Sequence, residues 1–505
     1  MGKKMSNKKF IAIMAPVLVL GMALGIGATV AGNYWSQSLD TYVGRGDRVV
    51  SNPKGTEDWD TKYYNKECAS ADGANGSKMK AAALTKRIAD EGIVLLKNKN
   101  NTLPLAKNSN VVPFGYRYVD PVYGGTGSGA VDGSEDYVET AVEGLKRHFN
   151  VNAGVSNKLI NNTGKAYALS TTELKQINGE VNNEGEGGGA FNGANTDIIE
   201  FKSDIYEGLV DSVTNDTAVV YIGRIAGEGG NLLNETYFDG TRDSLALSQY
   251  EKDTIRLAKE KCKKVVVIIN SSNIMEIKEL MSGELEADAI LWTAGPGSKG
   301  FESLADIMVG DVNPSGRTPD IWDANVLNNP TIINFGDHKY KDTDDISLWN
   351  GQNGVYYYEY EEGIYYGYRY YETAHDIHAE GFNYDEAVTF PFGYGLSYTS
   401  FEQSITSVDE RGDSIKVTVE VKNTGSVDGK EAVQIYYTAP YTALDQELHI
   451  EKATKNLIAF DKVEVKAGGK KSVTLEFPKE EMASYSYLHD NKDGTKGCYF
   501  LEEGD

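Results

Sequence analysis

The sequence predicts an α/β fold, a mainly parallel sheet flanked by helices, followed by a smaller β-sandwich and preceded by one transmembrane helix. Continuous apolar runs alternate with helical segments between residues 85 and 309, which is typical of parallel strands buried on both faces. Beyond residue 399, short segments alternate in apolar character, as sandwich strands do. Residues 10–32 carry no charge, which indicates a membrane segment.

The N-terminal segment has the length and the flanking charge of a membrane anchor. Four lysines among residues 1–9 precede the uncharged run 10–32, which as a helix would be ~34 Å long against a hydrocarbon core of ~30 Å. A cleaved signal peptide fits less well, because its apolar region is usually ~7–15 residues long. A buried core helix would not explain the lysines. We therefore expect residues 1–32 to be a signal anchor that crosses the cell membrane once, with the bulk of the chain extracytoplasmic.

Composition excludes several classes of protein. The net charge of −24, from 74 acidic and 50 basic residues, repels phosphate backbones and predicts no nucleic-acid partner. It is compatible with a neutral ligand such as a sugar, and the 32 tyrosines suit sugar rings and sandwich cores equally. Cys68, Cys262 and Cys498 are odd in number and far apart, which does not support a disulfide framework or a zinc site. The six histidines have no metal-ligand spacing, so we expect no metal and no cofactor.

The order of the expected elements gives the domain boundaries. Residues 33–84 form a polar stalk and lead-in, residues 85–398 the α/β domain, and residues 399–505 the sandwich. The Gly-rich stretch 182–189 is a surface loop or a loop that closes over a ligand. Helices are expected at 79–90, 138–149, 248–261 and 300–309, and strands at 92–96, 110–115, 218–223, 264–270, 289–292, 414–421, 432–437 and 472–477.

A series of motifs carries a resemblance to a known family. They are residues 90–98 (DEGIVLLKN) with 103–105 (LPL), 310–319 (GDVNPSGRTP), 362–371 (EGIYYGYRYY), 390–398 (FPFGYGLSY), 422–425 (KNTG) and 429–437 (GKEAVQIYY). In this order they resemble the α/β-sandwich and fibronectin type III-like domains of glycoside hydrolase family 3, over most of residues 85–505. Known members are often β-glucosidases, β-xylosidases or N-acetylglucosaminidases. The resemblance therefore implies a carbohydrate substrate.

The resemblance also implies a retaining mechanism with two carboxyl groups about 5 Å apart. In this family the nucleophile is an Asp on a (β/α)8 barrel, and the acid/base is usually a Glu on the α/β sandwich. Residues 222–230 (IGRIAGEGG) resemble the segment that bears the acid/base, which implies Glu228 as the catalytic residue. A carboxyl between glycines on a loop after a strand can be presented into a cleft. An exposed loop glutamate is the plain alternative, Glu235 and Asp239 are other candidates, and Asn231 stands where many members have Asp.

Four further residues are expected to bind the substrate. The loop 124–129 (GGTGSG) lacks the Gly-Lys-Ser/Thr ending and the G-x-G-x-x-G spacing of nucleotide sites. It resembles a family loop that borders the sugar cleft, although a tight turn explains it equally well. We expect Gly125 and Ser128 on this loop to contact the sugar, together with Arg224 and Trp292, because the strand ends of such sheets converge. Trp292 is equally compatible with the core.

The barrel of the family is not expected within this chain. A (β/α)8 barrel needs roughly 250 residues, and no stretch of that size is unassigned. We expect a truncated sandwich and a barrel that is encoded downstream or separately and acts as a partner. The leading hypothesis is an exo-acting enzyme that hydrolyses O-glycosyl bonds of β-linked glucosides or related oligosaccharides and is inactive without the barrel. The alternative is a non-catalytic cell-surface carbohydrate-binding or scaffold protein.

Overall fold

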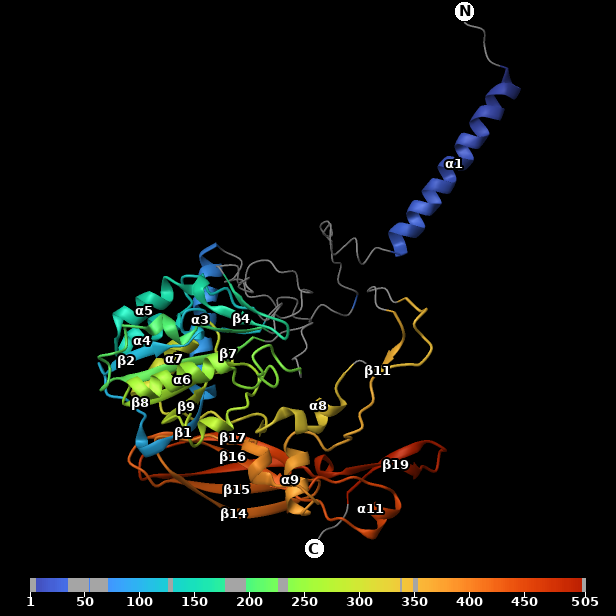
Figure 1. Cartoon of the computed structure of the whole chain (residues 1–505). Helices are drawn as coiled ribbons and strands as arrows, with labels where there is room; N and C mark the ends of the chain where they lie inside the picture. Colours follow the sequence, from blue (N-terminus) through green and yellow to red (C-terminus); the bar gives the residue numbers. More distant parts are fainter. Residues whose placement is uncertain are drawn as a thin grey trace, which may run out of the picture. The chain divides into compact units, whose positions relative to one another are not determined.

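The computed structural model describes residues 6–34, 54, 71–125, 130–177, 197–225, 235–336, 338–347 and 353–501. The chain divides into two units, residues 1–70 and residues 71–505, which are treated separately. In the first unit, helix α1 (Asn7–Tyr34) carries charge only at Lys8 and Lys9, is otherwise mainly apolar and contains Pro16 (Figure 1). Its segment Asn7–Thr29 has a mean hydropathy of 2.4 and is exposed. Its length and composition are those of a membrane span, and a signal sequence at the N-terminus would have the same properties.

The second unit begins with the α/β domain, whose six-stranded sheet has the order β1-β9-β8-β7-β2-β3. Strands β3, β2, β7, β8 and β9 pair in parallel, and the edge strand β1 runs antiparallel to β9. The sheet is therefore mainly parallel, as predicted, with one antiparallel edge. The strands are β1 (Val94–Asn98), β2 (Asn110–Phe114), β3 (Asn150–Val151), β7 (Thr217–Arg224), β8 (Lys264–Ser271) and β9 (Ala289–Trp292).

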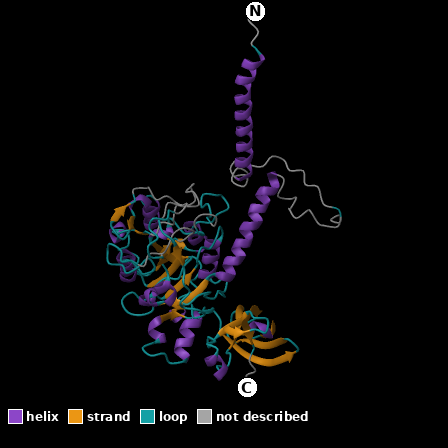
Figure 2. Cartoon of the chain, turned by 90° about the vertical axis from the view of Figure 1, so that its right-hand side faces the viewer, coloured by secondary structure: helices purple, strands orange, loops and turns teal. Residues whose placement is uncertain are grey.

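The helices of this domain surround the sheet in two groups (Figures 1 and 2). Helices α3 and α4 both pack on α7, and α5 and α6 both contact the short helix η6. Capping boxes begin two of them, at Thr140 with Glu143 and at Ser248 with Glu251, and satisfy the free N–H groups of the first turn. The helices are α3 (Ala71–Gly92), α4 (Ala141–His148), α5 (Ala153–Ile160), η6 (Ser203–Tyr206), α6 (Gln249–Lys261) and α7 (Gly300–Val309).

Most of the expected elements are found near their predicted positions. Strand β9 and helix α7 coincide with the predicted 289–292 and 300–309. The helix expected at 79–90 is longer, because α3 begins eight residues earlier at Ala71. A small antiparallel sheet was not expected, and it comprises β4 (Tyr167–Leu169), β5 (Leu174–Gln176) and β6 (Ile198–Glu200).

The C-terminal part of the second unit is an antiparallel β domain. The sheets β14-β15-β18 and β16-β17 enclose a core that includes Val417, Val421, Val433 and Val463, and a hairpin of β19 and β20 follows. Figure 2 shows these strands apart from the helix-covered sheet. The strands are β14 (Phe401–Arg411), β15 (Ser414–Asn423), β16 (Gly429–Tyr437), β17 (Asn456–Val465), β18 (Lys470–Pro478), β19 (Ser484–Asp490) and β20 (Lys496–Phe500).

A buried carboxyl group joins the short elements between these two domains. Asp323 lies in β10 (Trp322–Asp323) beside the fully buried Trp322. Its Oδ1 accepts a short hydrogen bond from the Tyr371 hydroxyl on α9 (Tyr368–Asp376), and its Oδ2 accepts one from Asn329 Nδ2 at 3.0 Å, at the start of α8 (Pro330–Asn334). Burial raises the pKa of Asp323 to about 6, even though both hydrogen bonds favour the charged form.

Stability should therefore depend on the protonation of Asp323. The folded protein holds this proton more tightly than the unfolded chain, so the stabilisation is complete below about pH 4 and is lost as the pH rises through about 6. The expected change is about 3 kcal/mol in the free energy of unfolding. Asp323→Asn should remove this pH dependence. The free energy of unfolding of the variant, relative to that of the wild type, should therefore rise by about 3 kcal/mol between pH 4 and pH 7.5. Urea unfolding followed by tryptophan fluorescence measures the difference, and parallel pH profiles for the two proteins would contradict it.

Candidate active site

The carboxyl ends of β2, β7, β8 and β9 lie at one edge of the sheet, and Asn270 at the end of β8 ties their loops together. The buried side chain of Asn270 accepts a hydrogen bond from Val122 N at 2.7 Å. Its amide donates to Val122 O and to Ala294 O, both at 2.8 Å. The loop after β2 and the loop after β9 are thus held over the end of β8. This is the edge at which open α/β sheets bind ligands.

Two glycines allow the backbones to approach closely at this edge. At Gly115, which has a φ of +90°, an added Cβ would lie 2.1 Å from Tyr221 O. At Gly223 an added Cβ would lie 2.2 Å from Asn270 O. No larger residue fits either position without a backbone shift. The glycines therefore allow the chain after β2 to pass directly against β7, and the end of β7 to pass directly against β8.

Arg224, expected to contact the substrate, is buried and turned inward. Its Nε donates to Ser244 O at 2.6 Å, and its two NH groups donate to Gly223 O at 3.0 Å and Ala246 O at 2.8 Å. Both NH groups also bind the carboxylate of Glu251, at 2.5 and 2.9 Å. All five guanidinium N–H groups therefore have protein partners. In this arrangement Arg224 holds the two ends of the segment between β7 and α6 together, and it offers no donor to a ligand.

Trp292, also expected at the cleft, lies in the core. Its ring packs edge-on against Trp322 with centroids 5.4 Å apart, and its Nε1 donates to Ser271 O at 2.7 Å. The side chain is 7% exposed. The structure therefore favours the core interpretation that the sequence left open.

Of the remaining predicted site residues, only Gly125 is among the described residues. Gly125 is half-buried, three residues after Val122, on the loop that Asn270 holds. Ser128 and Glu228 lie outside the described residues, as does the stretch 182–189. The segment that contains Glu228 follows β7, which ends at Arg224.

The two alternative carboxylates have different surroundings. Glu235 is exposed. The carboxylate of Asp239 accepts hydrogen bonds from Thr241 N at 2.9 Å and Gln249 N at 3.1 Å. Because Gln249 is the first residue of α6, Asp239 helps to cap that helix.

A buried acid that the sequence did not single out lies beside the exit of β2. Glu200 Oε1 accepts hydrogen bonds from Tyr116 N at 3.0 Å and Phe201 N at 2.7 Å. Burial, together with repulsion from Glu251, raises the pKa of Glu200 well above its usual range. Its position in an apolar run at the end of β6 is the only sequence signal that could have indicated it. Its contacts are to the backbone, which indicates that it shapes the turn after β2.

One group among the described residues has the ligand types of a metal site, although no metal was expected. His148 Nε2 lies 2.7 Å from Asp306 Oδ1 and 3.9 Å from Asp311 Oδ2. Lys86 pairs with Asp306 at 2.9 Å, and Lys107 pairs with Asp311 at 2.8 Å. These ammonium groups neutralise the carboxylates that a cation would need. We interpret the group as an ion-pair network.

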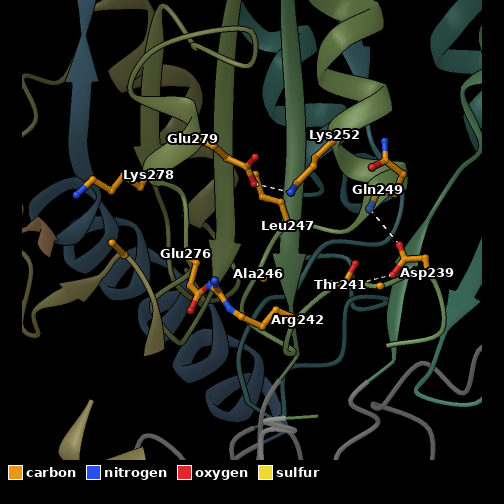
Figure 3. Close-up of a pocket in the computed structure, with 12 residues that line it drawn as sticks. Asp239, Thr241, Arg242, Ala246, Leu247, Gln249, Lys252, Glu276, Lys278 and Glu279 are labelled. Carbon is orange, nitrogen blue, oxygen red and sulfur yellow. Dashed lines mark hydrogen bonds and ion pairs between the residues drawn. The ribbon is translucent and has the colours of Figure 1, made fainter. Parts of the chain in front are cut away.

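A cavity of about 570 Å³ opens beside the segment between β7 and α6 (Figure 3). Charged groups of both signs surround it, and Lys252 of α6 is paired with Glu279 at 2.8 Å on one side of it. Ala246 and Glu276, which form a parallel β-bridge, both line it. It is lined by Asp239, Gly240, Thr241, Arg242, Ala246, Leu247, Gln249, Lys252, Glu276, Lys278, Glu279 and Ala324.

Comparison with known proteins defines the class. Residues 93–368 match the glycosyl hydrolase family 3 C-terminal domain, and residues 431–501 match a fibronectin type III-like domain. The first match covers more than half of the chain, so this protein belongs to glycosyl hydrolase family 3. The resemblance that the motifs indicated is confirmed. No match to the N-terminal barrel domain of the family is found.

Among the relatives, β-glucosidase A of Butyrivibrio fibrisolvens is 29% identical over 86% of this chain and 50% of its own length. A β-glucosidase of Ruminococcus albus is 32% identical over 78% of this chain and 36% of its own length. Among solved structures, a β-glucosidase from Paenibacillus barengoltzii has a TM-score of 0.64 at 30% identity, over 84% of this chain and 40% of that one. The β-glucosidase 3B of Thermotoga neapolitana, in complex with α-D-glucose, has a TM-score of 0.61 at 29% identity over 80% of this chain and 50% of that one. The chain thus spans half or less of the length of these relatives.

Proposed function

We propose that this chain is the acid/base-bearing part of a retaining β-glucosidase and becomes active when a (β/α)8 barrel supplies the nucleophile. The observation that supports the proposal most strongly is the hydrogen-bond network of Arg224. Four hydrogen bonds from Arg224 hold the end of β7 to residues 244–251 at the start of α6, and the segment with Glu228 connects these two points in the chain. Such a frame suits a loop that must present one carboxyl group in a fixed place.

Each group would have a defined part in the reaction. Glu228 would protonate the glycosidic oxygen as the barrel's Asp attacks the anomeric carbon, and would then take a proton from the water that releases the sugar. Gly125 and Ser128 would border the sugar on the loop after β2. The substrate class, β-linked glucosides, is supported by the names of the relatives.

The cellular place of this activity is part of the proposal. The exposed apolar helix α1 would anchor the protein in the cell membrane, and the lysines before it would keep the N-terminus in the cytoplasm. The α/β and fibronectin-like domains would then face the outside, where β-glucosides reach them directly.

The test compares the chain alone with the chain joined to a barrel. The full chain, in a detergent without a sugar headgroup, should not hydrolyse 4-nitrophenyl β-glucoside above the buffer rate. Joined to the half of B. fibrisolvens β-glucosidase A that it does not cover, it should turn the substrate over. Turnover by the chain alone would show that the nucleophile lies within it. A joined protein that folds but stays inactive would favour a non-catalytic carbohydrate-binding protein.

A further inference from the structure

The cavity at the start of α6 has no part in the proposed reaction, yet hydrogen bonds and an ion pair hold residues that line it in place. Glu276 is 5% exposed, its N donates to Leu245 O at 3.0 Å, and its Oε1 accepts from Val326 N at 2.5 Å. Arg242 forms an ion pair with the same carboxylate. The cavity therefore exists before any ligand binds, and a ligand would not have to order it.

The charges of the cavity are balanced in pairs. Lys252 Nζ lies 2.8 Å from Glu279 Oε1, and Lys278 Nζ donates to Glu386 O at 2.9 Å. Asp239 accepts from two backbone N–H groups. Because each charged group already has a partner, the cavity has no excess of positive charge for a phosphate and no excess of carboxylates for a metal ion.

A sugar is the ligand that fits alternating donors and acceptors of this kind. A hydroxyl group both donates and accepts, while a paired carboxylate keeps free lone pairs and a paired ammonium keeps further N–H groups. Lys252 and Glu279 on one side, and Arg242 and Glu276 on the other, present both types toward the cavity (Figure 3). A volume of about 570 Å³ is within the range of small-molecule sites.

Apolar side chains complete the lining of the cavity. Ala246, Leu247 and Ala324 lie among its charged residues. Sugar rings carry apolar C–H faces, which pack well on such a surface.

We propose that this cavity is a second saccharide site, which binds a neutral glucosyl unit apart from the reacting carbon. The choice of a glucosyl unit rests on the proposed function. The unit could come from the leaving-group end of an oligosaccharide or from free glucose, the product. If the unit belongs to an oligosaccharide, the site would raise the affinity for longer substrates. If it is free glucose, the site would bind the product of the reaction.

The experiment measures saccharide binding by the full chain in a detergent without a sugar headgroup. Glucose, cellobiose and cellotriose are titrated by calorimetry into the wild type and into Lys252→Met and Glu279→Gln, with circular dichroism to confirm folding. Lys261→Met is the matched control, because Lys261 lies on the same helix, is also ion-paired, and has a similar exposed fraction, 28% against 26%. We expect saturable binding that each cavity variant weakens at least tenfold and that Lys261→Met leaves unchanged.

The outcomes separate this site from the proposed function. Affinity that rises from glucose to cellotriose supports the oligosaccharide as the source, and equal affinity supports free glucose. Binding that Glu228→Gln abolishes and the cavity variants do not would overturn the proposal, as would no saccharide binding at all. An inactive barrel-joined protein whose saccharide binding still depends on Lys252 would overturn the enzymatic function and leave this site in place.

Discussion

Replacing Arg224 by Met is expected to lower the free energy of unfolding by about 3–5 kcal/mol, because it leaves a buried carboxylate without its partner. Arg224 and Glu251 are 4% and 2% exposed, and two hydrogen bonds join them. The same change removes donors from Ser244 O and Ala246 O. Met has a similar length, so the effect would come from charge and hydrogen bonding and not from a cavity.

The matched control for this change is an exposed ion pair formed by an arginine of α6, the helix that carries Glu251. Arg256 of α6 binds Glu284 at 2.6 Å, with side chains 36% and 70% exposed. Arg256→Met should cost at most about 1 kcal/mol, as exposed ion pairs do. Urea unfolding of both variants, followed by tryptophan fluorescence, to which the buried Trp292 and Trp322 contribute, gives the comparison. Equal losses of unfolding free energy in the two variants would show that Arg224 does not hold the end of β7 to the start of α6.

In the barrel-joined enzyme, Glu228→Gln should slow the hydrolysis of a poor leaving group, such as that of methyl β-glucoside, by about 10²–10⁴-fold. Gln cannot give a proton to the departing oxygen. A 2,4-dinitrophenyl leaving group departs with little protonation, so its glycosylation step should slow by about tenfold or less. A burst of dinitrophenol measures that step separately from the later release of the sugar.

The loss of rate caused by Glu228→Gln must therefore depend on the leaving group of the substrate. Glu235→Gln is the matched control, because Glu235 lies at the end of the same segment and is exposed. It should leave the rates on both substrates within about twofold, as a surface change does. An equal loss on both substrates in Glu228→Gln would assign Glu228 a binding or structural part in place of proton transfer.

The parts of the fold that the sequence predicted are those with a strong local signal. Strand β9 and helix α7 have an uninterrupted apolar run and a clear helical period, and both were placed correctly. Strand β14 was missed because its outward residues Ile405 and Val408 are exposed, so the strand has no clear alternation. The antiparallel direction of β1 could not be predicted, since an apolar run does not encode the direction of its partner.

The site was predictable only where a motif identified a loop. The segments after β2 and β7 were expected at one edge, and Asn270 and Arg224 indeed hold parts of them there. The inward turn of Arg224 was not predictable, because its partner Glu251 lies 27 positions further along the chain. The burial of Trp292 likewise depends on contact with Trp322, which the sequence separates from it.

The most direct measurement of the central claim is the product that Glu228→Ala forms with azide in the barrel-joined enzyme. If Glu228 is the acid/base, its loss leaves the glycosyl-enzyme without a general base, and azide can attack the anomeric carbon without one. With 2,4-dinitrophenyl β-glucoside, azide should then restore turnover and yield β-glucosyl azide. Glucose as the sole product, at a rate that azide does not change, would contradict the account.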